Sequence, residues 1–172
     1  LLQTVLLHLN QDQTLILDGG ALSILAKTGM NFPKAHLVLT PHQREWQVLS
    51  GLDLTSQGAE ETGEALKRFP KGTILVQKGF ATRIWQAGQT DCYQLSVGGP
   101  YQATGGMGDT LAGMIAGFAG QFPQASLYKR VTVATYLHSA IAQELAEDSY
   151  VVLPTMISQQ IPVFMKKIQK DT

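Results

Sequence analysis

The chain has 172 residues, of which 44% are hydrophobic and 15% charged, as in a globular protein rather than a disordered one. Its 13 Lys and Arg residues balance its 13 Asp and Glu residues, so the sequence carries no electrostatic footprint for nucleic acid or for an anionic membrane. The single cysteine, Cys92, excludes an internal disulfide and a cysteine-based zinc cluster, and it favours a cytoplasmic location.

The start of the chain has the apolar spacing of a helix, with leucine or valine at positions 1, 2, 5, 6 and 9. This segment is too short to span a bilayer and lacks the basic flank of a signal peptide. Because the sequence begins at Leu1 rather than at Met, we interpret the segment as the end of a helix that starts earlier. We therefore expect residues 1–172 to be the C-terminal portion of a single domain.

Short apolar runs alternate with helical patterns over the first half of the chain. The runs at 14–17, 37–39 and 73–77 are continuous and largely apolar, as are the buried strands of parallel sheets. Helical patterns lie near 20–28, 42–50 and 56–69. This alternation predicts an α/β fold with a mostly parallel sheet.

The following segment has the pattern of a β-hairpin, and the remainder has the pattern of helices. Polar and apolar residues alternate at 82–86 and at 91–95, which predicts a small hairpin with one exposed face. Helices are predicted at roughly 108–121, 125–147 and 155–169, with Pro123 and Pro154 between them.

Glycine is concentrated between 98 and 120, above all in the string Thr104-Gly105-Gly106-Met107-Gly108-Asp109. Glycine at a helix start lets backbone N–H groups approach a ligand closely, and the helix dipole favours an anion such as phosphate. The sequence has no G-x-x-x-x-G-K-[ST] motif of a P-loop, and the G-x-G-x-x-G pattern fails because position 111 is leucine. A simple tight turn, with Asp109 complementing the helix dipole, is the alternative interpretation.

Several other residues have structural interpretations. Gly113 and Gly117 form a G-x-x-x-G pattern, which we expect to let their helix pack closely against a neighbour at 131–146. Asp18 follows a predicted strand and could approach a ligand or cap the next helix. Packed side chains are expected at His138, Trp46 and Trp85.

The glycine-rich string resembles the turn of the ribokinase-like superfamily, whose kinases carry a catalytic Asp at a helix start. The longer segment 98–113 is more specifically similar to the ADP/ATP-dependent NAD(P)H-hydrate dehydratases. Segment 39–45 (Leu-Thr-Pro-His-Gln-Arg-Glu) resembles their T-P-H-x-G-E block, and segment 76–82 (Val-Gln-Lys-Gly-Phe-Ala-Thr) resembles their K-G-x-x-T block, in the same order. Arg44 departs from the Gly of the first block, and Gly20 departs from the second Asp of a D-A-D-A-L block.

The resemblance implies a ribokinase-like three-layer α/β/α sandwich with a mostly parallel sheet and a small β-hairpin, whose N-terminal part is absent from this chain. It also implies repair of hydrated NADH and NADPH: phosphorylation of the ring hydroxyl by ADP or ATP, then elimination of phosphate. Asp109 would be the catalytic base, close to the substrate, because a carboxylate can accept the proton of an attacking hydroxyl. The backbone around Gly105, Gly106, Met107 and Gly108 would stabilise the transferring phosphoryl group.

The same resemblance assigns the nucleotide to two segments. Lys78, Gly79, Phe80, Ala81 and Thr82 would wrap the nucleotide, and Gly108 would also touch its AMP portion. Taken without the family, the Lys-Gly segment has the pattern of an ordinary β-turn with an exposed lysine.

His42 and Glu45 follow the second predicted strand at the start of a helix. The resemblance places His42 against the hydrated dinucleotide, whereas a lone His there could equally cap the helix or be partly buried. Glu45 could serve a hydrated metal ion or complement the helix start. We expect Mg²⁺ held largely by phosphates and water, with no dedicated metal site.

Two other functions remain open at this point. One is a vitamin-precursor kinase of the hydroxymethylpyrimidine or hydroxyethylthiazole type, and the other is a catalytically silent nucleotide-binding protein. Expected partners are small molecules, with no nucleic acid and no membrane, and family members form homo-oligomers. The residues do not decide between ADP and ATP as the phosphoryl donor.

Overall fold

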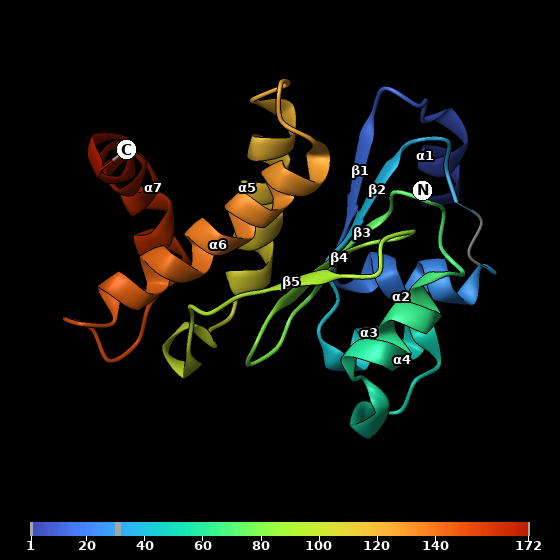
Figure 1. The fold of residues 1–172 in the computed structure, drawn as a ribbon, viewed down its shortest axis with the longest axis horizontal. Helices are drawn as coiled ribbons and strands as arrows, with labels where there is room; N and C mark the ends of the chain where they lie inside the picture. Colours follow the sequence, from blue (N-terminus) through green and yellow to red (C-terminus); the bar gives the residue numbers. More distant parts are fainter. Residues whose placement is uncertain (1, 30–31, 172) are drawn as a thin grey trace. The chain divides into compact units, whose positions relative to one another are not determined.

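The computed structural model describes residues 2–29 and 32–171. The chain forms two compact units, the first ending at Gln94 and the second beginning at Leu95. Figure 1 shows the helices and strands of each unit with their labels. Each unit has a buried apolar core of its own.

The first unit is built on a five-stranded sheet. Its elements, in chain order, are α1 (Leu2–His8), β1 (Thr14–Leu17), α2 (Gly20–Lys27), β2 (His36–Leu39), α3 (Gln43–Ser50), the 3₁₀ turn η1 (Leu54–Ser56), α4 (Ala59–Leu66), β3 (Ile74–Gln77), β4 (Arg83–Gln86) and β5 (Cys92–Gln94).

The sheet has the strand order β1-β2-β3-β4-β5. The first three strands are parallel, with Leu17 paired with Leu39 and Leu39 paired with Leu75. Helices connect these strands because parallel neighbours need a crossover, whereas β3, β4 and β5 follow one another in antiparallel order. The predicted α/β class, with parallel strands followed by a hairpin, is confirmed.

The core of the first unit joins the sheet to α2, α3 and α4. The ring of Trp46 on α3 is fully buried and lies 5.8 Å from the ring of Phe69, and Trp85 on β4 is 2% exposed. Both tryptophans are therefore packed, as predicted. The core residues are Leu17, Leu22, Leu25, Leu37, Leu39, Trp46, Leu49, Ala65, Leu66, Phe69, Leu75, Trp85 and Ala87.

The hairpin differs from its prediction in one respect. Ile84 and Trp85, which are neighbours on β4, are both buried. Since neighbouring residues of a strand point to opposite faces, β4 is buried on both faces. The prediction of one exposed face is wrong for β4, whereas Tyr93 on the edge strand β5 is 42% exposed.

The helix predicted near 56–69 is shorter than its pattern. Residues 54–56 form η1, and α4 begins only at Ala59. Gly58 separates them as the N-cap of α4, with an extended backbone (φ −66°, ψ −179°). The helical sequence pattern therefore extends across Gly58, although the backbone of this residue is not helical.

The second unit is helical. It contains the 3₁₀ turn η2 (Pro100–Gln102), α5 (Met107–Gly120), α6 (Leu127–Leu145) and α7 (Pro154–Asp171). The three predicted helices are confirmed to within two residues at each end. Pro154 is the first residue of α7 rather than a break, because the first turn of a helix needs no backbone donor there.

Three residues of the second unit, His138, Gly113 and Gly117, were predicted to pack against a neighbouring element. His138 on α6 is 5% exposed, which confirms it as a packed histidine. A Cβ at Gly113 would meet no heavy atom within 4 Å, and a Cβ at Gly117 would meet only Gln121 Nε2, at 4.0 Å. The prediction that these glycines let α5 pack on residues 131–146 is therefore wrong.

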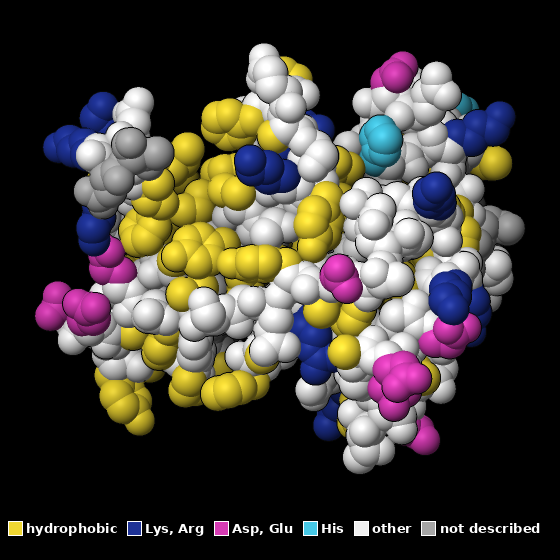
Figure 2. All heavy atoms as spheres, viewed as in Figure 1, with side chains coloured by type: hydrophobic (Ala, Val, Ile, Leu, Met, Phe, Trp, Pro, Cys, Tyr) yellow, Lys and Arg dark blue, Asp and Glu magenta, His cyan; other side chains and the backbone are white. Residues whose placement is uncertain are grey.

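Apolar side chains gather on the surface over α6 and α7 in Figure 2. A groove of about 320 Å³ lies between the end of α5, α6 and α7, lined by Phe118, Phe122, Ala125, Lys129, Arg130, Val133, Leu137, Met165 and Ile168. No helix among the described residues is long and apolar enough to cross a membrane.

Candidate functional site

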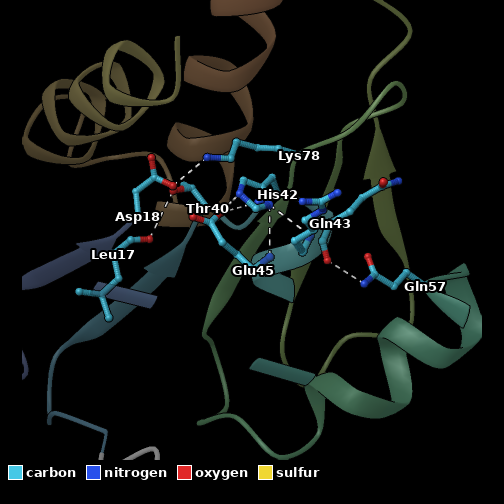
Figure 3. A network of polar contacts seen from close by, with 9 residues as sticks. Leu17, Asp18, Thr40, His42, Gln43, Glu45, Gln57 and Lys78 are labelled. Atoms are coloured by element: carbon cyan, nitrogen blue, oxygen red, sulfur yellow. Dashed lines mark hydrogen bonds and ion pairs between the residues drawn. The ribbon is translucent and has the colours of Figure 1, made fainter. Parts of the chain in front are cut away.

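In the first unit, polar residues follow each of the three parallel strands. Asp18 follows β1, Thr40 and His42 follow β2, and Lys78 follows β3. Ligands of open α/β sheets bind outside the carboxyl ends of the strands. Figure 3 shows these side chains near one another at that edge, with Asp18 and Lys78 joined by an ion pair.

His42 is the N-cap of α3. Its Nδ1 accepts hydrogen bonds from the backbone N–H of Arg44 at 3.1 Å and of Glu45 at 3.2 Å. The carboxylate of Glu45 accepts in return from the backbone N–H of His42 at 2.8 Å, which completes a capping box. The capping interpretation of His42 and the helix-start interpretation of Glu45 are therefore both confirmed.

The imidazole of His42 also has a side that the cap does not use. Its Nε2 lies 3.6 Å from Glu45 Oε2, and 55% of its side chain is exposed, against 13% for Glu45. Because the cap uses only Nδ1, the exposed edge of the ring can still reach a ligand. Contact with a dinucleotide stays a prediction.

Lys78 is held by an interaction that was not predicted. Its ammonium lies 2.7 Å from Asp18 Oδ1, and the two residues are 60 positions apart in the chain. The backbone N–H of Lys78 donates to the carbonyl of Pro41 at 2.8 Å. Asp18 does not cap α2, because Gly19 occupies the N-cap position.

The remaining residues of the K-G-x-x-T block form the turn between β3 and β4. The hydroxyl of Thr82 donates to the carbonyl of Gly79 at 3.3 Å, and Ala81 is half-buried. Phe80 is 95% exposed. This geometry fits the turn that the local pattern predicted, and the expected nucleotide contacts stay predictions.

In the second unit, the glycine-rich turn leads directly into α5. Gly106 is its N-cap and has a positive φ of 87°, a conformation that L side chains rarely adopt. Its carbonyl accepts the first helical hydrogen bond, from Thr110 N at 2.9 Å. The hydroxyl of Thr104 donates to the carbonyl of Val152 at 3.0 Å and anchors the turn.

Residues next to the turn are largely fixed by packing. The backbone N–H of Met107 donates to the Thr104 carbonyl at 3.3 Å, and its side chain is 7% exposed. Met107 therefore supports the turn from inside the core, and the backbone N–H groups of Gly105, Gly106 and Gly108 are left as candidate hydrogen-bond donors to phosphate.

Tyr101 lies on η2, close before the turn in the sequence. Burial raises the pKa of its hydroxyl, which finds no hydrogen-bond partner in the described structure.

Asp109 lies in the first turn of α5 and is exposed. Within the described residues its carboxylate makes no hydrogen bond or ion pair, unlike those of Asp18 and Glu45. The helix N-terminus favours a negative charge here. An exposed carboxylate with no structural partner, placed behind a glycine turn, is suited to accept a proton from a ligand.

The described part of the chain contains no group of three or more His, Cys, Asp or Glu side chains that could hold a metal ion. The carboxylates of Glu45 and Asp109, both expected near phosphate, differ in whether they are free to bind a ligand. Glu45 is engaged in the capping box, whereas Asp109 is not. This donor set fits an ion such as Mg²⁺ only if phosphates and water supply most of its ligands.

A mostly parallel sheet covered by helices, together with a glycine-rich turn that leads into a helix with an Asp in its first turn, defines a ribokinase-like protein. A ribokinase-like superfamily protein of Enterococcus faecalis V583 has a similar structure, with a TM-score of 0.86 and 41% identity, covering 96% of this chain and 57% of that one. Residues 2–163 match the family described as NAD(P)H-hydrate dehydratase, and the chain belongs to this family.

Named relatives agree with this assignment. An ADP-dependent (S)-NAD(P)H-hydrate dehydratase of Streptococcus pneumoniae R6 is 66% identical over 98% of this chain, and one of Streptococcus thermophilus is 54% identical over 97%. The chain spans 58% and 60% of the lengths of these two relatives.

A solved relative was crystallised with a nucleotide. The ADP/ATP-dependent NAD(P)H-hydrate dehydratase of Bacillus subtilis, co-crystallised with ATP and Mg²⁺ and soaked with CoA, matches with a TM-score of 0.80 and 31% identity. The match covers 93% of this chain and 58% of that one.

Proposed function

We propose that the protein carrying this chain uses ADP to dehydrate hydrated NADH and NADPH. The observation that carries the proposal is that Asp109, directly behind the positive-φ turn at Gly106, is exposed and has no side-chain partner in the part of the chain that the structure describes. Family membership supplies the substrate class, and the names of the streptococcal relatives favour ADP over ATP as the donor.

The first step is phosphoryl transfer to the ring hydroxyl of the hydrated nicotinamide. The hydroxyl oxygen attacks the terminal phosphorus of ADP, its proton passes to Asp109, and AMP leaves. A hydroxyl is a poor nucleophile, and a positioned base accelerates such a step by about 10²- to 10⁴-fold. Backbone N–H groups of Gly105, Gly106 and Gly108 hold the phosphoryl oxygens while charge redistributes, at the positive end of α5.

The second step restores the dihydronicotinamide. The bond between ring carbon and phosphate oxygen breaks, inorganic phosphate leaves with the bonding electrons, and loss of a ring proton forms the double bond. Phosphate is a far better leaving group than hydroxide. A phosphoryl donor is therefore consumed in a reaction whose net result on the ring is loss of water.

The nucleotide and the dinucleotide are assigned to different residues. Lys78, Gly79, Phe80, Ala81 and Thr82 bind ADP, with Gly108 touching its AMP portion. His42 contacts the hydrated dinucleotide through the exposed edge of its ring, since the cap uses only Nδ1.

Mg²⁺ neutralises phosphate charge when it is bound, and phosphates and water would be its main ligands. Glu45 would support it through a water molecule, because its carboxylate is already engaged with the backbone of His42. Removal of Mg²⁺ with EDTA is expected to abolish turnover.

The organisation of the protein belongs to the same proposal. We place both units in one ribokinase-like domain that works as a homo-oligomer in the cytoplasm. The family assignment supports the single domain, because one family match runs through both units. Size-exclusion chromatography with light scattering measures the oligomeric state.

The proposal is tested with the full-length protein, Mg²⁺ and hydrated NADH, by following recovery of dihydronicotinamide absorbance. ADP and ATP are supplied separately, and a reaction without nucleotide is the control. We expect recovery with ADP and none without nucleotide. A folded, ADP-binding protein that gives no recovery with either nucleotide would contradict the proposal.

A further inference from the structure

The ion pair between Asp18 and Lys78 ties together strands that are not neighbours. Asp18 follows β1 and Lys78 follows β3, and both strands flank β2, so the pair crosses the end of β2 (Figure 3). The side chains are 19% and 21% exposed. Water therefore screens this pair less than it screens a pair at the open surface.

Other lysine pairs in the chain are of a different kind. Lys67 pairs with Glu64 and Lys167 pairs with Glu144 at distances of 2.5 and 2.6 Å, but all four side chains are at least 49% exposed. The main chain of Lys78 is tied to the loop after β2, through the hydrogen bond to Pro41 O at 2.8 Å and the bridge to His42.

We infer that Asp18 is a positioning residue that holds the Lys78 ammonium ready for the phosphates of the nucleotide. This inference rests on the proposed nucleotide role of Lys78. An ammonium group has three donors, so the bond to Asp18 leaves two for phosphate oxygens. A lysine side chain that is already ordered loses less conformational entropy when the ligand binds. Asp18 also cancels the lysine charge, so its benefit is orientation rather than added attraction.

The test is a double-mutant cycle on ADP affinity, measured by calorimetry on the full-length protein. Asp18→Ala should weaken ADP binding by up to about tenfold, because the freed Lys78 side chain then loses its conformational entropy when ADP binds. Lys78→Ala should weaken it at least as much. If Asp18 acts through Lys78, the double variant should match Lys78→Ala to within about twofold.

Three controls separate positioning from stability. Asp18→Asn keeps an acceptor oxygen of the same shape and should restore part of the affinity. Glu144→Ala removes the same charge from a lysine pair in the second unit and should leave ADP affinity unchanged. Melting temperatures of all variants give the folded fraction, and if Asp18→Ala does not fold, Asp18→Asn takes its place in the cycle.

Each outcome decides between named alternatives. Unchanged ADP affinity in Asp18→Ala, or additive losses in the double variant, would overturn the inference while leaving the role of Lys78 intact. Unchanged affinity in Lys78→Ala would overturn the nucleotide role of Lys78, and the inference with it. A lowered melting temperature with normal affinity would make the pair a purely structural clamp.

Discussion

The charged side chains of the candidate site are held differently in the two units. In the first unit, His42, Glu45, Asp18 and Lys78 bond to one another or to the backbone at the ends of parallel strands. In the second unit, the carboxylate of Asp109 has no partner among the described residues. Residues of the first kind have a structural reason to be present, whereas Asp109 has no evident one apart from the favourable helix end. Substitution of Asp109 should therefore cost activity alone, whereas substitution of His42 should cost stability as well.

The sharpest test of this contrast is Asp109→Asn. We expect turnover to fall by about 10³-fold, because the amide cannot accept the proton of the attacking hydroxyl. The free energy of unfolding should change by less than about 1 kcal/mol, since the side chain is exposed, has no partner among the described residues and loses only the favourable interaction with the helix end. Steady-state kinetics and urea unfolding measure the two quantities. Normal turnover in this variant would remove Asp109 from the mechanism.

A matched glycine pair separates the geometry of the turn from its ligand. Gly106→Ala should destabilise the protein by about 1–2 kcal/mol, because it places a side chain at positive φ. Its Cβ would also lie 3.3 Å from Pro154 Cγ. Gly105→Ala meets no heavy atom within 4 Å and should fold normally. If phosphate approaches the backbone here, Gly105→Ala should nevertheless weaken ADP binding, and normal binding would argue against that approach.

His42 tests whether one residue serves two roles. His42→Ala should cost about 1 kcal/mol through loss of the N-cap. For a chain of this size that lowers the melting temperature by about 2–4 °C. Asn is a good N-cap, so His42→Asn should recover the melting temperature but not the affinity for hydrated NADH. Full recovery of both by Asn would reduce His42 to a helix cap.

The smallest effect concerns the thiol of Cys92 on β5. Burial raises its pKa, and the nearby Arg83 guanidinium lowers it only in part. The folded protein binds the thiol proton more tightly than the unfolded chain does. The contribution of Cys92 to the free energy of unfolding is therefore fully present below the thiol pKa of the unfolded chain, and it is lost as the pH rises through the thiol pKa of the folded protein. At pH 8, alkylation should be at least about threefold slower in the folded protein than in urea. Equal rates would place Cys92 outside the packed sheet.

Local patterns predicted the elements, whereas the contacts between them needed the fold. Continuous apolar runs located β1, β2 and β3, because burial on both faces leaves that signature in β2 and β3. The edge strand β1 has the same signature although three of its four residues are only half-buried. The capping box at His42 and Glu45 was also readable, since N-cap and N3 positions are three residues apart. The pair of Asp18 and Lys78 was missed because 60 residues separate them. A usable signal was that both follow strands flanking the same central strand.

Two errors have the same origin. The small residues Gly113 and Gly117 suggested close helix packing, but spacing alone does not say which face of a helix meets a neighbour. Alternation at 82–86 suggested one exposed face, but burial of β4 depends on what covers the sheet rather than on the strand itself. In both cases tertiary contacts decided what the local pattern could not.

The central claim is that the phosphoryl group goes to the ring hydroxyl and then leaves as phosphate. Product stoichiometry tests it most directly, with AMP, inorganic phosphate and recovered NADH quantified from the same reaction of full-length protein, ADP, Mg²⁺ and hydrated NADH. The account predicts equal amounts of all three, and a matched loss of all three in Asp109→Asn. A phosphorylated product that accumulates without release of inorganic phosphate would contradict it and would identify a kinase instead.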